Sequence, residues 1–279
     1  MENEALKILE SQESNDFSKS IEWVDIDMTR LSYGGILYPK GISIQVKRFS
    51  VEEVRFFTGL QESEGARNVN RAIGYLLENC VRIKAGQKIL KGIHIFEHDR
   101  FSLVLMAREI SDLGSEMFGE YECHKCGSEE KAPLNPGTLE YKDCEYMKKF
   151  DGSVFNLNTK KGLFKYLPLT YEESTKVLEW SLKMKGVNDE FKVSFLKLAP
   201  FLRFNNEEFS MKKLEESFME LSKEQISILD FLSRTVPSAT GRVTTKCSSC
   251  GEVGSTAVSF RSISDIVSPI IDQQGIFED

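Results

Sequence analysis

The chain has 279 residues, of which 41% are hydrophobic and 28% charged, so it can bury a substantial core in one large domain or two smaller ones. Its formal net charge is −7, and residues 1–28 hold eight acidic side chains against only Lys7 and Lys19, which leaves the rest of the chain nearly neutral. A nearly neutral body has no broad positive field, which disfavours non-specific binding of nucleic acid. The sequence shows no secretion signal and no apolar run near the roughly 20 residues of a membrane helix, so we expect a cytoplasmic protein without a membrane span.

Residues 1–28 combine their acidic side chains with Ser and Asn and lack a sustained apolar period. This composition predicts an acidic arm that is flexible or becomes ordered on a partner. Glycines and Pro39 then mark a turn-rich segment over residues 31–41, and alternation of apolar and polar residues over 42–49 predicts a half-buried strand.

Three helices are predicted in the N-terminal α+β region, residues 29–140. Ser50 and Glu53 have the spacing of a capping box, which predicts a helix beginning directly after Ser50. Residues 66–81 repeat apolar residues on one helical face, and Cys80 belongs to that buried face. Asp99 is the expected N-cap of a third helix that fades near Gly114.

The next segment, residues 141–240, is rich in helical patterns and is predicted to be a helical insert. We expect helices over 171–185, 191–202 and 211–232, the last interrupted near Ser222. The remaining residues, 241–279, hold strand-prone stretches over 242–246 and 255–260 on either side of a cysteine pair.

Two Cys-x-x-Cys-Gly sequences carry the clearest chemical signal in the chain. Cys123 and Cys126 form one pair, Cys247 and Cys250 the other, and both have strand-like flanks. Two intervening residues allow a tight turn that directs both sulfurs at one ion, and the following glycine permits a positive φ. Four cysteines in this pattern predict a tetrahedral structural Zn²⁺ site with these residues as ligands.

The two pairs are 120 residues apart, so the predicted zinc ribbon is split by the helical insert. Closing such a loop costs about 4 kcal/mol, whereas a structural zinc site supplies on the order of 10–16 kcal/mol at neutral pH. Zinc can therefore hold the two distant turns together. The predicted fold class is α+β: a small strand-rich zinc ribbon split by a long helical insertion, with an N-terminal strand and helices.

Redox chemistry is the competing use of Cys-x-x-Cys, but it favours a cysteine at a helix N-terminus, and these pairs lie among turns and strands. A lone cysteine, Cys144, is interpreted as incidental.

His94 and His98 form a His-x-x-Glu-His sequence like that of inverted zinc proteases. That site requires both histidines on one helix, whereas this stretch reads as a strand or loop that precedes Asp99. Other catalytic motifs are missing as well, so no catalytic residue is assigned and the chain is not expected to be an enzyme.

The order of several short motifs resembles the T4-type myovirus family of baseplate hub subunits and hub assembly proteins. The motifs are residues 31–39 with their two glycines, residues 42–44 and 51–54, residues 79–81, Asp99 and Arg100 with Ala107 and Arg108, and then the first cysteine pair. The resemblance covers mainly residues 30–130, and Ser32 stands where the family usually has proline.

This resemblance implies a non-enzymatic structural or assembly protein of a contractile-tail baseplate hub. Its partners would be other tail and baseplate hub proteins, with self-association also open, and its location would be the host cytoplasm during assembly or the virion baseplate. A zinc-ribbon adaptor that binds nucleic acid or polymerase is the alternative. The charges near the cysteine pairs are balanced, which favours the baseplate reading.

Overall fold

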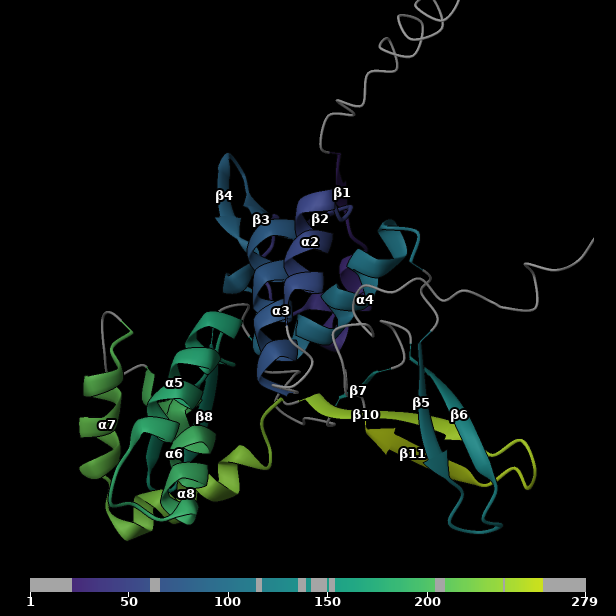
Figure 1. Cartoon of the computed structure of the whole chain (residues 1–279). Coiled ribbons are helices and arrows are strands. Elements are labelled where there is room, and N and C mark those ends of the chain that lie inside the picture. Colours follow the sequence, from purple (N-terminus) through teal and green to yellow (C-terminus); the bar gives the residue numbers. More distant parts are fainter. Residues whose placement is uncertain are drawn as a thin grey trace, which may run out of the picture.

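The computed structural model describes residues 22–60, 66–113, 117–134, 139–141, 150, 154–203, 209–237 and 239–257. Three parts are visible in Figure 1: an N-terminal body up to residue 113, a helical module within residues 154–237, and a double hairpin from residues 117–141 and 239–257. Mixed helices and small antiparallel sheets make this an α+β fold, as predicted. No helix among the described residues is long and apolar enough to cross a membrane.

The body contains a four-stranded antiparallel sheet in the order β1-β2-β3-β4. Its strands are β1 (Trp23–Asp25), β2 (Ile42–Lys47), β3 (Val81–Ala85) and β4 (Lys88–Lys91). The predicted strand is β2, whereas β3 and β4 were not predicted, and β1 falls within the predicted acidic arm. Residues 1–21 of that arm lie outside the described residues.

Helices α2 (Val51–Gly59), α3 (Ala66–Cys80) and α4 (Arg100–Ile110) complete the body. The capping box at α2 is confirmed, because Ser50 accepts from the Glu52 amide while Glu53 accepts from the Ser50 amide. Cys80 is fully buried, as its place on the apolar face predicted.

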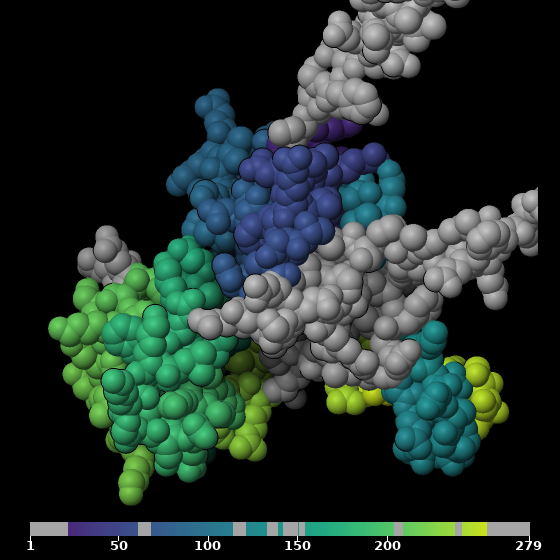
Figure 2. Space-filling view, in the orientation of Figure 1, coloured from purple at the N-terminus to yellow at the C-terminus, as the bar shows by residue number. Residues whose placement is uncertain are grey.

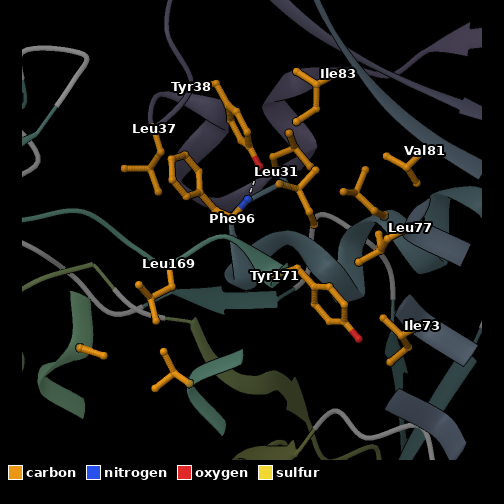
Figure 3. Packing of buried hydrophobic residues seen from close by; sticks show 14 of the residues in the cluster. Leu31, Leu37, Tyr38, Ile73, Leu77, Val81, Ile83, Phe96, Leu169 and Tyr171 are labelled. Carbon is orange, nitrogen blue, oxygen red and sulfur yellow. Dashed lines mark hydrogen bonds between the residues drawn. The ribbon is translucent and has the colours of Figure 1, made fainter. Parts of the chain in front are cut away.

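Asp99 is the N-cap residue of α4, as predicted, but its side chain makes no capping hydrogen bond there. The carboxylate is fully buried and accepts from the Tyr38 hydroxyl at 2.6 Å and from the Ser32 amide at 2.7 Å. Tyr38 in turn accepts from the Phe96 amide at 3.2 Å (Figure 3). The glycine-rich segment is thereby joined to the start of α4 through a buried polar network. The short 3₁₀ turn η1 (Met28–Arg30) precedes that segment, and a second one, η2 (Ser32–Gly35), lies within it.

The helical module contains α5 (Tyr171–Lys183), α6 (Asp189–Leu202), α7 (Met211–Met219) and α8 (Lys223–Ser233). The predicted helices are confirmed, including the break near Ser222, which caps α8. A hairpin of β8 (Phe155–Thr159) and β9 (Gly162–Tyr166) also belongs to the module and was not predicted.

The body and the helical module share one hydrophobic core, seen from close by in Figure 3. Tyr171 of α5 lies near Ile73 and Leu77 of α3, and its hydroxyl donates to the Asn70 carbonyl at 2.9 Å. A Cβ on Gly74 would lie 3.3 Å from that hydroxyl oxygen, so a residue without a side chain suits this close approach. Backbone hydrogen bonds between residues 95–97 and 169–171 join the same two parts.

The double hairpin lies at the lower right of Figures 1 and 2, whereas the helical module lies at the lower left and the body above them. One hairpin pairs β5 (Met117–Glu122) with β6 (Glu129–Leu134), and the other pairs β10 (Ala239–Lys246) with β11 (Val253–Ala257). Strand β7 (Leu139–Tyr141) pairs with the other edge of β10. Chain segments more than a hundred residues apart thus form one small unit.

Candidate metal centre

The two Cys-x-x-Cys-Gly sequences form turns with the same backbone geometry. In the first turn the Cys123 amide donates to the Ser128 carbonyl and the Gly127 amide donates to the Cys123 carbonyl, at 2.9 and 2.8 Å. In the second turn the corresponding bonds join Cys247 with Glu252 and Gly251 with Cys247, at 2.8 and 2.9 Å. This repeated geometry makes the two turns, here called the knuckles, equivalent halves of one site.

The glycine after each cysteine pair adopts the left-handed conformation predicted from the sequence. Gly127 has φ 70° and Gly251 has φ 72°, values that cost other residues roughly 1–2 kcal/mol. Each glycine therefore allows the chain to leave its knuckle and enter the second strand of the hairpin.

The four sulfur atoms of Cys123, Cys126, Cys247 and Cys250 all lie within 4.8 Å of one another. Across the two knuckles, Cys123 Sγ is 3.7 Å from Cys250 Sγ, and Cys126 Sγ is 3.6 Å from Cys247 Sγ. Zinc–sulfur bonds of about 2.3 Å in a tetrahedron place sulfurs roughly 3.8 Å apart. The spacing is far longer than a disulfide bond and close to a tetrahedral shell, so the residues present fit a soft metal ion.

Burial differs between the first and second cysteine of each knuckle. Cys123 and Cys247 are each 2% exposed, whereas Cys126 and Cys250 are exposed. One side of the site therefore faces solvent, which gives an ion or a chelator a direct route to it.

The electrostatics of the sulfur cluster favour a cation. The Ser128 hydroxyl lies 3.1 Å from Cys126 Sγ and lowers the pKa of that thiol to about 6. The pKa of Cys250 rises to about 12: the Glu252 backbone lowers it, but desolvation and contacts with the other three sulfurs raise it more. Four thiolates cannot share this space without a compensating positive charge.

Polar side chains around the sulfurs connect the two knuckles, and the sequence alone did not single them out. Glu130 of β6 accepts from the amide and the hydroxyl of Ser248, which lies between the two cysteines of the second knuckle. Lys125 in the first knuckle pairs with Glu252 after the second at 2.8 Å. In the sequence, Glu130 lies four residues after Cys126 and Glu252 lies two residues after Cys250. Their partners, Ser248 and Lys125, are 118 and 127 residues away, so no local pattern indicates these contacts.

The histidines of the His-x-x-Glu-His sequence do not form a metal site. They lie in separate short turns, η4 (Gly92–His94) and η5 (Glu97–Asp99). His94 is paired with Glu172 at 3.3 Å, while burial, aided by Arg100, lowers the pKa of His98 to about 4. Within the described parts of the chain, the four cysteines are the only group of three or more potential ligands, and Cys144 lies outside those parts.

The fold and the site together define an α+β protein in which two hairpins from distant parts of the chain meet around four cysteines. The family model of the T4 bacteriophage base plate protein matches residues 26–268. The chain therefore belongs to this family and is a phage baseplate structural protein, which assembles with other tail proteins in the virion tail. No curated protein and no solved structure matches the chain significantly.

Proposed function

We propose that the protein is a non-enzymatic structural or assembly component of the baseplate hub, and that one structural Zn²⁺ bound by Cys123, Cys126, Cys247 and Cys250 stabilises it. The observation that carries the metal assignment is the convergence of four sulfurs from two knuckles with the same backbone geometry. Zinc in such a site would supply charge compensation and a cross-link, and it would leave no open position for catalysis.

The predicted division of the chain is part of this proposal. An acidic arm at residues 1–28 would contact neighbouring proteins, residues 29–140 and 241–279 would each supply one knuckle, and the helical insert at 141–240 would separate them. A rigid unit with an adaptable arm suits a protein that must dock several neighbours in a fixed order.

The side chains around the knuckles support this proposal over binding of nucleic acid. Lys125 is paired with Glu252, and Arg242 donates to the hydroxyl and carbonyl oxygens of Ser255. Basic groups that are already paired are less available to grip phosphates.

Zinc content of the purified protein tests the metal assignment. Wild type is expected to hold one zinc per chain, and Cys123→Ser or Cys247→Ser to lose it along with solubility or folding. Cys126 and Cys250 are exposed, so the variants Cys126→Ser and Cys250→Ser remove a ligand without changing a buried side chain. If wild type folds fully in the absence of zinc and binds none when zinc is added, the assignment is wrong.

Mass spectrometry of purified tails distinguishes the two forms of this proposal, because a structural component remains in the particle whereas an assembly factor is present only in precursors. A chain lacking residues 1–21 keeps β1 and so tests the arm separately. Normal hub assembly with that chain would contradict a role for the arm.

A further inference from the structure

Glu130 is a residue outside the four cysteines that joins the two knuckles through several hydrogen bonds. It lies on β6, one residue after the strand begins, and reaches across to the turn between Cys247 and Cys250. Its Oε1 atom accepts from the Ser248 amide at 3.1 Å and from the Ser248 hydroxyl at 2.9 Å. Both donors belong to a turn 118 residues further along the chain.

Ser128 connects the same carboxylate to the sulfur atoms. Its hydroxyl donates to Glu130 Oε1 at 3.1 Å and lies 3.1 Å from Cys126 Sγ and 3.2 Å from Cys247 Sγ. One hydroxyl of the first knuckle is thus in contact with a cysteine from each knuckle. Contacts of this kind around metal ligands fix the ligand orientation and change affinity without touching the ion.

We infer that Glu130 is a positioning residue: in the closed form of the double hairpin it holds the second knuckle in register with the first, so that all four sulfurs are directed at one ion. This inference rests on the proposed metal site. The contact between Cys247 Sγ and Glu130 Oε1, at 3.1 Å, requires a thiol proton and is lost when Cys247 becomes a metal-bound thiolate. The hydrogen bonds from Ser248 and Ser128 do not depend on that proton and remain to hold the carboxylate.

The role predicted for Glu130 depends on an acceptor oxygen more than on a negative charge. A carboxylate beside four thiolates adds unfavourable repulsion, whereas a Gln side chain keeps an oxygen acceptor for Ser248 and Ser128 without the charge. Glu130→Gln should therefore preserve the alignment, and Glu130→Ala should lose it.

Competition with a chromogenic zinc chelator tests the inference in the full-length chain. Glu130→Ala is expected to weaken zinc binding about 10- to 100-fold, as is typical for residues that orient metal ligands, while Glu130→Gln retains most of the affinity. Glu129→Gln is the matched control, because this neighbouring side chain is exposed, and it should bind as wild type does. Equal affinity of Glu130→Ala and wild type would overturn the inference, and so would a loss in Glu130→Gln as large as that in Glu130→Ala.

Hydrogen exchange in the metal-free protein supplies a readout that does not depend on zinc. The Ser248 amide should exchange faster in Glu130→Ala than in wild type or Glu129→Gln, because its acceptor is gone. Unchanged exchange would also overturn the inference. A third outcome separates the two proposals. If wild type binds no zinc but the Ser248 amide still exchanges faster in Glu130→Ala, the proposed metal site is contradicted, whereas the alignment of the knuckles by Glu130 is supported.

Discussion

Glu97 lies at the junction of the body and the helical module, where its backbone amide donates to the Leu169 carbonyl. Its carboxylate contacts Arg100, but one oxygen, Oε2, is buried without a hydrogen-bond partner among the described residues. Burial raises the pKa of Glu97 to about 7 and outweighs the opposing effect of Arg100. The folded protein therefore binds this proton more tightly than the unfolded chain does.

This pKa shift predicts that Glu97 lowers stability as pH rises. Between pH 4.5 and 7 the unfolded chain has already released the proton that the folded protein retains, so the contribution of Glu97 is most favourable below pH 4.5 and is lost by pH 7. Glu97→Gln, a neutral side chain of similar shape, should gain stability relative to wild type as pH rises from 5 to 8, by on the order of 1–3 kcal/mol. Urea unfolding of both proteins across this range measures the difference.

The matched control is Glu109→Gln, because Glu109 is a half-exposed carboxylate that pairs with Arg30. Its difference from wild type should stay within about 1 kcal/mol at every pH, the usual range for surface pairs. A Glu97→Gln protein that loses stability relative to wild type on going from pH 5 to pH 8 would show that the ion pair with Arg100 outweighs burial.

Individual residues also show which features can be predicted from the sequence and which cannot. The four cysteines could be identified because their spacing and the glycines report local turn geometry. Asp99 was assigned to a helix cap because capping is a local pattern. Its actual partners, Tyr38 and Ser32, lie 61 and 67 residues earlier, and only the folded chain brings them together.

At the level of elements, the docking of the two hairpins depends on a glycine that the knuckles themselves do not require. A Cβ on Gly254 of β11 would lie 2.5 Å from a ring carbon of Tyr121 on β5, closer than side chains tolerate. Gly254→Ala is expected to separate the hairpins, to cost about 1–3 kcal/mol as overpacking does, and to weaken zinc binding. Thermal unfolding and zinc competition measure the two effects.

Gly251→Ala is the informative comparison for that variant. Nothing lies within 4 Å of a Cβ at Gly251, so its cost comes only from the positive φ of one turn and should be roughly 1–2 kcal/mol. Relief of the Gly254→Ala defect by Tyr121→Ala would confirm the steric cause. No relief in the double variant would contradict it.

Local patterns predicted the helices better than the strands. Three of the four module helices begin at side-chain caps, Thr170, Asn188 and Ser222, and such signals are contained in a few neighbouring residues. The β8–β9 hairpin was missed although Phe155 and Leu157 are buried on one face, because the intervening asparagines have low strand propensity. Strands β3 and β4 are short and gain their order from the sheet, where β3 pairs with β2 and β4 pairs with β3.

At the scale of the whole molecule, the sequence predicted that two knuckles far apart in the chain meet at one site. It did not predict how the other strands and helices pack around that site and against each other. Equal cysteine motifs imply a shared ion however far apart they lie. Pairing of β7 with β10, and packing of the body against α5, depend on contacts between distant segments that no local pattern reports. The resemblance carried by residues 30–130 indicated the family, and the match over residues 26–268 confirmed it.

Among the side chains that the structure describes, the double hairpin has only a small core of its own, which makes metal removal a test of the architecture. Its buried cluster consists of Ala132, Leu139 and Val243, whereas the body and the helical module share a much larger core. We therefore expect the double hairpin to open more often after zinc removal, with its closed form still populated, while the remaining core stays folded. Hydrogen exchange should accelerate in residues 117–134 and 239–257 but not in α3 or α4.

The size of that effect follows from binding linkage. Free zinc at 1,000 times its Kd stabilises the bound form by about 4 kcal/mol, which corresponds to roughly a thousandfold change in the exchange of amides that open with the site. Chelation of the Glu129→Gln control should act as it does on wild type. Chelation that removes the metal and leaves hairpin exchange unchanged would mean that the hairpins hold together through Glu130, Lys125 and Tyr121 alone. Zinc would then occupy a site that the protein has already closed, and it would not be the cross-link that closes it.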